Sequence, residues 1–305
     1  PGQSATFSLA RGEARQFMAT PPMAATCTDR VSDVAEFECG SPGSQFFCRE
    51  QKDYCVPQAL HDLTGSRVSA MGKVAVYTGS PCTFVPFDRY ACDHLEESVA
   101  PMETWGKNFL VAISEALRVG EPNIIRILSG EDGNTLHFEP AVHADVTLNS
   151  GEWVELVETR DFQVQSSGAL SVNQYLVGQD YAGLQSFYDR ALSGQVEVGD
   201  PSYTVIPPVE QYRSDYSFLT PSTYEENWVM VTAPEGARVE LDGQPLDGWQ
   251  TVGSSGYSTT RLQVAPGAHT MQGDSTFGIQ VYGFGAYTSY MYPGGLDLKE
   301  INPII

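Results

Sequence analysis

The stretch Asn123-Ile-Ile-Arg-Ile-Leu-Ser-Gly-Glu-Asp-Gly-Asn-Thr-Leu-His-Phe138 decides how the whole chain is interpreted. β-Branched and apolar residues stand on both sides of a Gly-Glu-Asp-Gly turn, which is typical of a β-hairpin. A similar stretch, Asn227-Trp-Val-Met-Val-Thr-Ala-Pro-Glu-Gly-Ala-Arg-Val-Glu-Leu241, follows roughly 100 residues later, a period too long for a solenoid repeat. The sequence therefore predicts duplicated all-β modules.

Each copy continues with a Leu/Val pair, a Gly turn and an aromatic strand. These are Val146–Gly151 and Val172–Tyr175 in the first copy, and Leu262–Gly267 and Ile279–Tyr282 in the second. A partial copy opens the chain, with Phe7–Gly12 and Val74–Tyr77. We expect the two full copies to superpose, with Gly133 on Gly236, Gly151 on Gly267 and Tyr175 on Tyr282.

The predicted fold class is all-β: tandem β-sandwich-like modules with short helices in the connections and a disulfide-stapled insertion. The expected modules span residues 1–97, 98–198 and 199–305, and the insertion spans residues 21–60. The expected helices are Tyr181–Leu192 and Val56–Leu63. The first module lacks its front half, so we expect the chain to start inside a longer protein; no basic region followed by an apolar core opens it.

The apolar patterning and the turn residues between strands also give strand positions. The expected strands of the second module are Asn108–Ile113, Ile124–Leu128, Thr135–Phe138, Asp145–Leu148, Trp153–Val157, Phe162–Gln165 and Leu170–Leu176. Tyr203–Ile206 follows as a strand that two prolines end. Those of the third module are Tyr216–Leu219, Trp228–Thr232, Arg238–Leu241, Thr259–Val264 and Phe277–Phe284.

The chain is strongly acidic, with 38 Asp and Glu against 17 Lys and Arg and a formal charge of −21. Such a surface repels nucleic acid and anionic lipid, and keeps an extracellular protein soluble. No apolar run approaches the roughly 18 residues that span a bilayer. Clustered carboxylates leave Ca²⁺ as a possible cofactor, but no Asp-x-Asp-x-Asp-Gly loop allows a site to be assigned.

All six cysteines fall in one region of the chain. Their spacing contains no CxxC pair, and an even count in loop-like sequence predicts disulfides and an oxidising compartment, secreted or at the cell surface. Cys82 and Cys92 flank a short loop and are expected to bond to each other. Three pairings of the others are open, and we favour Cys48–Cys55 with Cys27–Cys39.

Several blocks of the sequence resemble the N-terminal domain of IgGFc-binding proteins. They are Val74–Cys82, Cys92–Lys107, Gly199-Asp-Pro-Ser202, Pro207–Tyr212, Val281–Gly285 and Ser289-Tyr290, in the family's order. The resemblance covers residues 61–296, whereas the cysteines from Cys27 to Cys55 are not part of the family pattern. It implies a domain of a large secreted or surface protein, in animals or in bacteria, that stands beside adhesive modules. Fc binding itself is not carried over, because no compact binding motif matches.

Three groups suggest chemistry, and each has a structural alternative that we prefer. Cys92-Asp93-His94 offers a thiol beside a histidine, but Cys82 is a nearby disulfide partner. His137 and His143 are candidate metal ligands, although such residues are more often ordinary surface histidines. Gly199-Asp200-Pro201 resembles the Gly-Asp-Pro-His self-cleavage motif of some mucin-type domains. Ser202 replaces its histidine, so we expect a turn.

The aromatic residues near the C-terminus are the candidate binding surface. Period-two spacing turns half of a strand's side chains to the core, so this reading competes with plain core packing. The candidate residues for binding are Tyr282, Phe284, Tyr287, Tyr290 and Tyr292.

The predicted function is a non-catalytic interaction or adhesion module that binds a protein or glycan outside the cell. The alternative is a structural subunit of an extracellular assembly, in which edge strands or the tail Ile301-Asn-Pro-Ile-Ile305 pair with neighbours. A secreted hydrolase is the third possibility, but no Gly-x-Ser-x-Gly elbow occurs. At the join before the second module, Trp105-Gly-Lys107 is expected to pack rigidly, with Gly106 allowing a close backbone approach.

Overall fold

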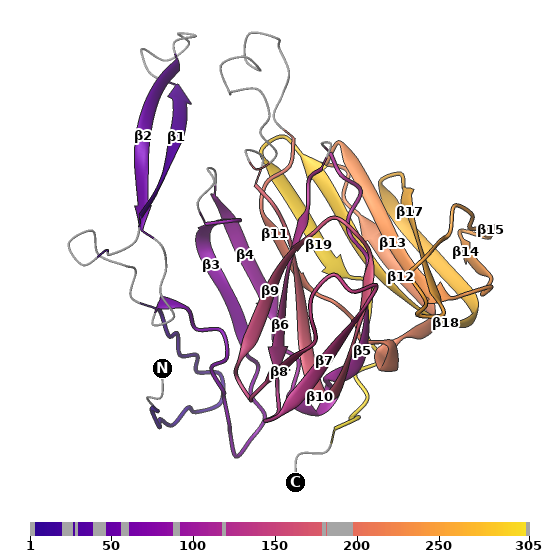
Figure 1. The fold of residues 1–305 in the computed structure, drawn as a ribbon, viewed down its shortest axis with the longest axis horizontal. Coiled ribbons are helices and arrows are strands. Elements are labelled where there is room, and N and C mark those ends of the chain that lie inside the picture. The colour runs from indigo at the N-terminus through magenta and orange to yellow at the C-terminus, as the bar shows by residue number, and fades with distance from the viewer. Residues whose placement is uncertain are drawn as a thin grey trace.

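The computed structural model describes residues 4–19, 27, 30–38, 47–55, 61–87, 92–117, 120–178, 181 and 198–302. Two large antiparallel sheets dominate it, and they lie side by side in Figure 1. The first sheet contains β5 (Gly106–Val111), β6 (Asn123–Ser129), β7 (Asn134–Glu139), β8 (Val146–Leu148), β9 (Trp153–Glu158), β10 (Phe162–Leu176) and β11 (Ser202–Val205). The predicted all-β fold is confirmed.

The second sheet uses the C-terminal part of the chain. It contains β12 (Arg213–Thr220), β13 (Glu226–Pro234), β14 (Val239–Leu241), β15 (Gln244–Pro245), β16 (Gln250–Thr251), β17 (Tyr257–Gln263), β18 (Gly267–Gly285) and β19 (Thr288–Pro293). The strand order is β8-β7-β10-β6-β9 in the first sheet and β15-β14-β18-β13-β17-β16 in the second. The two paths correspond strand for strand, and only β16 lacks a counterpart.

One long strand organises each sheet. The first half of β10 pairs with β5 and β7, and its second half pairs with β6 and β11. β18 does the same with β12 and β14, then with β13 and β19. Because one continuous strand contributes to both layers, each sheet curls around its own core. The expected strands Phe162–Gln165 and Leu170–Leu176 are therefore two halves of a single strand.

The pairing register tests the predicted alignment of the two copies. Tyr175 pairs with Ile124, and Tyr282 pairs with Trp228, at the same place in the two strand orders. Gly133 and Gly236 both occupy hairpin turns at positive φ, where a residue without Cβ is favoured.

The predicted alignment of Gly151 with Gly267 is wrong. Gly151 lies between β8 and β9, whereas Gly267 begins β18. The counterpart of Gly151 is instead Gly256, which precedes β17 at a φ of 76°. Turn composition misled the sequence comparison, because both segments carry a Leu/Val pair followed by glycine.

Each sheet encloses an apolar core. Phe109, Ile125, Ile127, Leu136, Phe138, Phe162, Val164 and Leu170 are almost fully buried in the first. Val229, Val231, Met271, Phe277, Ile279 and Val281 are almost fully buried in the second. The inward positions of the strands carry these residues, as the period-two pattern requires.

A third apolar cluster joins the two sheets. Ala112 and Leu176 of the first sheet pack against Met230, Tyr282 and Phe284 of the second. Buried amides add specific polar contacts across the same junction, because Gln280 Nε2 donates to Gln174 Oε1 at 3.0 Å. The two sheets are therefore fixed to each other by both packing and hydrogen bonds.

Two hairpins precede the large sheets: β1 (Arg30–Glu38) with β2 (Phe47–Cys55), and β3 (Tyr77–Phe84) with β4 (Cys92–Ser98). The expected strand Val74–Tyr77 begins only at its last residue. The second hairpin docks on the first large sheet, since Val85 and Leu95 are buried against Ile124 and Val177.

The structure corrects the pairing of the N-terminal cysteines. Cys27 bonds to Cys55, with 5.7 Å between their Cα atoms. The favoured pairs Cys48–Cys55 and Cys27–Cys39 are therefore both wrong. Cys39 lies outside the described residues, as does the side chain of Cys48. Nearly all of the expected helix Tyr181–Leu192 and most of Val56–Leu63 also lie outside them.

The join before the first large sheet is compact. Trp105 is half-buried, its Nε1 donates to Ala100 O at 3.0 Å, and a Cβ on Gly130 would lie 3.2 Å from its ring. Gly106 is buried beside Pro208, and a Cβ at position 106 would overlap that ring. The close approach expected at Gly106 therefore brings the segment that enters the first large sheet beside Pro208, in the segment that enters the second.

The C-terminal segment completes this junction. Gln211 Nε2 donates both to Thr104 O at 2.9 Å and to Lys299 O at 2.8 Å. Ile301 N donates to Glu103 O at 2.7 Å. The described part of the tail, up to Asn302, is thus docked on its own chain, which leaves less reason to assign it to a neighbour.

Candidate functional site

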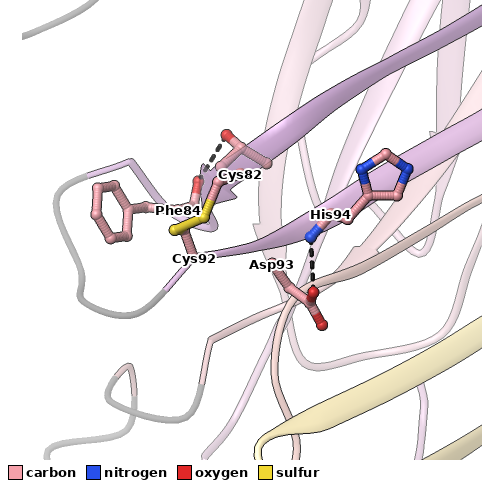
Figure 2. Close-up of a disulfide and its surroundings, with 6 residues drawn as sticks. Cys82, Phe84, Cys92, Asp93 and His94 are labelled. Carbon is pink, nitrogen blue, oxygen red and sulfur yellow. Dashed lines mark hydrogen bonds between the residues drawn. A yellow bond between two sulfur atoms is a disulfide. The ribbon is translucent and has the colours of Figure 1, made fainter.

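The block Cys92-Asp93-His94 holds a disulfide and no free thiol. Cys82 and Cys92, which the sequence predicts to be bonded, close the end of the β3–β4 hairpin, as Figure 2 shows. The backbone N–H of His94 donates to Asp93 Oδ1 at 2.6 Å, while its ring lies 3.5 Å from Glu96 in an exposed position. A sulfur held in a disulfide cannot attack a substrate, so this block pins a hairpin.

The two candidate metal histidines have separate partners. His137 Nδ1 lies 2.9 Å from Asp145 Oδ1, with both side chains more than half exposed. His143 faces the Ala144 carbonyl at 2.5 Å and packs edge-on against Phe138. Among the described residues, no group of three or more His, Cys, Asp or Glu side chains is placed to hold a metal ion.

Gly199-Asp200-Pro201 forms a turn that leads into β11. Gly199 has a φ of 88°, and the backbone N–H of Asp200 donates to Ser289 Oγ at 2.9 Å. Asp200 and Ser202 are both 6 % exposed. The turn thus joins the end of the first sheet to β19 of the second.

The candidate binding residues fall into two groups. Tyr282 and Phe284 are 0 % and 3 % exposed, so they belong to the cluster between the sheets and are wrong as members of a binding surface. The hydroxyl of Tyr282 accepts the Glu115 N–H at 2.8 Å, which is an internal contact. Tyr287, in the turn between β18 and β19, is 50 % exposed.

The remaining tyrosines form a row at the surface of the second sheet. Tyr290 and Tyr292 stack on β19, with ring centroids 6.0 Å apart, and Tyr224 packs edge-on against Tyr290 at 4.7 Å. We call Tyr224, Tyr290 and Tyr292 the tyrosine row. All three are half-buried, and Leu219 beside them is 64 % exposed.

Hydrogen bonds and glycines set the orientation of these rings. Tyr290 Oη donates to Asn227 Oδ1 at 2.7 Å, and Tyr292 Oη donates to Leu219 O at 2.6 Å. Gly283, opposite Tyr290 in the ladder, has no Cβ that would displace the ring. Burial raises the pKa of both Tyr290 and Tyr292, so both hydroxyls remain donors at neutral pH. Such preordered amphipathic rings suit protein recognition.

Leu219 and Tyr224 are members of this surface that sequence reasoning did not identify. Leu219 belongs to the expected strand Tyr216–Leu219, where an apolar residue predicts a core position, and Tyr224 stands in the β12–β13 loop. The tertiary contacts place them at this surface: Leu219 O accepts the Tyr292 hydroxyl, and the Tyr224 ring packs against Tyr290. A single aromatic residue in a loop carries no pattern that points to a distant strand.

The second sheet also holds a hydrogen-bonded pair of titratable side chains, His269 and Asp242. His269 Nδ1 lies 2.7 Å from Asp242 Oδ2, its Nε2 lies 2.8 Å from Ala265 O, and Phe218 stacks on the ring. Burial lowers the pKa of His269, but the hydrogen bonds to Asp242 and Ala265 outweigh it, so the net shift is upward. The hydrogen bond from His269 lowers the pKa of Asp242.

We expect this pair to make stability depend on pH. Because the folded-state pKa of His269 is raised, its contribution is fully present below the unfolded value of about 6.5 and is lost as pH rises through the folded pKa. The difference in Tm between wild type and His269→Gln should therefore shrink from about pH 6 to about pH 9. Asp242→Asn, which keeps an oxygen for the Thr270 N–H, should show the same trend. A constant difference across this range would contradict the assignment.

These features define an all-β, disulfide-bonded module with a tyrosine-rich surface. The family described as "IgGFc binding protein" matches residues 1–283, and the chain belongs to this family. The human protein named "IgGFc-binding protein" is 22 % identical over 254 residues, which are 81 % of this chain and 4 % of that protein. The chain therefore corresponds to a small part of that relative.

Comparison with solved structures gives only distant similarities. A lectin of Pleurotus ostreatus in its apo form is 8 % identical, with a TM-score of 0.17 over 62 % of this chain and 73 % of its own. An anti-sigma factor domain-containing protein from Clostridium clariflavum is 10 % identical, with a TM-score of 0.19 over 62 % of this chain and 82 % of its own. Scores this low support no argument about fold or function. Within the described residues, no helix is long and apolar enough to cross a membrane.

Proposed function

We propose that this chain is a non-catalytic interaction module of a secreted or cell-surface protein, and that the tyrosine row with Leu219 binds a protein partner. The observation that carries the proposal is the preordered, partly exposed row of three tyrosines beside a leucine that is 64 % exposed. Aromatic rings contribute large contact area at little entropic cost, and protein interfaces are enriched in them.

Two further observations support the setting. The disulfides Cys27–Cys55 and Cys82–Cys92 favour an oxidising compartment. The family's description and the human relative's name both refer to binding of IgG Fc. This supports a protein as the partner class and makes Fc a sensible first probe.

The test is binding of the intact chain to an array that carries immobilised IgG Fc, extracellular proteins and glycans. For any protein probe that binds, Leu219→Asp should weaken affinity at least about tenfold, because it places a charge within an apolar contact. Leu298→Asp is the matched control, since Leu298 is 53 % exposed outside the tyrosine row. Equal affinity for wild type and Leu219→Asp, or binding to glycans alone, would reject the proposal.

A further inference from the structure

The hairpin β3–β4 occupies the same place within its repeat as two other strand pairs, β10–β11 and β18–β19, occupy within theirs. Each pair ends in one equivalent backbone hydrogen bond: Val99 N to Val76 O at 2.9 Å, Ile206 N to Val172 O at 2.8 Å, and Gly294 N to Ile279 O at 3.1 Å. β3–β4 therefore corresponds to the ends of β10–β11 and β18–β19. This fixes the register, with Val76 level with Val172 and Ile279.

The strand β3 lacks a neighbour that both of its counterparts possess. The second half of β10 lies between β11 and β6, and the second half of β18 lies between β19 and β13. Among the described residues, β3 pairs with β4 alone. In Figure 1, β3 lies on the outer side of β4, away from the two large sheets. Its other edge is where a counterpart of β6 and β13 would run.

Apolar side chains at this edge are exposed where their counterparts form core. Val74, level with Leu170 and Phe277, is 51 % exposed, whereas both counterparts are 0 % exposed. Counting back along the chain places Val68, at 61 % exposure, level with Val164 at 0 %. Burying such valines against a partner would remove apolar surface from water and so favour a complex. Val68 and Val74 are thus apolar residues at positions that are buried in the other two repeats, but here they are exposed to solvent.

The N-terminal segment Phe7–Gly12 would border the other side of a strand added beside β3. β13 lies between β18 and β17, and the N-terminal Phe7–Gly12 matches the end of β17 through Leu262–Gly267. Phe7 and Leu9 of this segment are 41 % and 42 % exposed. A strand added at the free edge of β3 would therefore lie between two apolar segments, β3 and Phe7–Gly12. In the second sheet, β13 lies in the same way between β18 and β17.

We propose that the free edge of residues 74–80 accepts an extended strand with the pattern that β6 and β13 share, an Asn followed by alternating core-facing apolar residues. This interaction surface is separate from the tyrosine row, and it does not depend on the proposed function. The partner adds as an antiparallel strand and seals Val74 and Val76, in the manner of β-strand addition. β9, which ends one side of the first sheet, carries Glu155 and Glu158, whereas β3 carries no charged residue to discourage pairing.

The ladder geometry identifies the backbone groups that would bond the partner. Val76 O bonds toward β4, and successive residues of an antiparallel strand alternate between its two edges. The N–H groups of Tyr77 and Gly79 therefore point to the free edge, and that of Thr78 points to β4. An added strand should protect the amides of Tyr77 and Gly79 from hydrogen exchange without changing the exchange of the Thr78 amide.

The experiment uses the full chain and a synthetic peptide covering Glu226–Pro234. The peptide should bind at 1:1 stoichiometry and slow exchange at the amides of Tyr77 and Gly79. Val74→Asp should weaken binding at least about tenfold, because it places a charge against the apolar face. Tyr77→Pro, which removes one edge N–H, is an independent second variant. Val157→Asp is the matched control, since Val157 is 55 % exposed on the edge strand β9.

Four results of the peptide experiment would overturn the inference. They are no saturable binding up to about 1 mM peptide, which is a binding free energy near −4 kcal/mol; protection at another edge; equal loss of binding in Val157→Asp; or equal binding of a peptide in which Val229 and Val231 are Asp. Concentration-dependent protection of the same amides without peptide would also overturn it, because the occupant would then be a second copy of this chain.

Discussion

Replacing Arg261 with Ala is expected to lower the free energy of unfolding by about 3–5 kcal/mol. Arg261 on β17 forms an ion pair with Asp161, which precedes β10, and their side chains are 13 % and 14 % exposed. Arg261 Nε also donates to Ile113 O at 2.6 Å. The variant leaves the Asp161 carboxylate largely buried at the junction of the two sheets, with Thr259 and the Ile113 N–H as its remaining partners among the described residues.

Denaturant titration followed by tryptophan fluorescence measures this loss. Arg213→Ala is the control, because its partner Asp215 lies at 3.4 Å and their side chains are 43 % and 66 % exposed. Such an exposed pair contributes at most about 1 kcal/mol. Asp161→Ala and the double variant complete a double-mutant cycle. Additive losses in that cycle would show that the two charges are not coupled across the junction.

Tyr282→Ala should be about as destabilising, with a loss of roughly 3–5 kcal/mol. The ring is 0 % exposed between the sheets, stacks on Trp228 and contacts Phe284 edge-on. Its removal leaves a cavity that two paired sheets cannot easily collapse to fill. Tyr282→Phe isolates the hydroxyl, whose loss deprives the Glu115 N–H of its acceptor in a part-buried hydrogen bond, at a cost of about 0.5–1.5 kcal/mol.

Thermal and denaturant unfolding of both variants check the expectation. Tyr77→Ala is the matched control, since Tyr77 is 73 % exposed and should cost well under 1 kcal/mol. If Tyr282→Ala unfolded at the same denaturant concentration as Tyr77→Ala, the two sheets would not be joined through this cluster. Faster proteolysis between residues 198 and 213 in Tyr282→Ala would be the expected companion result.

Much of the strand layout follows from local pattern. β-Branched runs such as Ile124–Leu128 and glycines at positive φ such as Gly133 and Gly236 fix strands and hairpins through near-neighbour preferences. The same is true of Cys82–Cys92, because its loop is short. These features need no knowledge of distant parts of the chain, so the sequence was sufficient to predict them.

Burial of the aromatic residues did not follow from local pattern. Tyr282, Phe284, Tyr290 and Tyr292 look alike in a period-two run. The first two face the other sheet, and the last two lie at the outer rim. The difference depends on which face of β18 the first sheet covers. For the same reason the partner of Cys55 is Cys27: β1 and β2 pair Arg30 with Cys55, which brings the chain near Cys27 back to it.

The amino-acid sequence by itself determined the all-β class, most strands and turns, the Cys82–Cys92 bond and the family. Each of these depends on residues close together in the chain or on motifs read in order. The tertiary structure alone decided which tyrosines are exposed, how the sheets join through Asp161 and Arg261, and which edge of β3 is open. Those properties depend on how strands pair and sheets pack, including contacts between residues as far apart as Asp161 and Arg261, and no local pattern encodes that geometry.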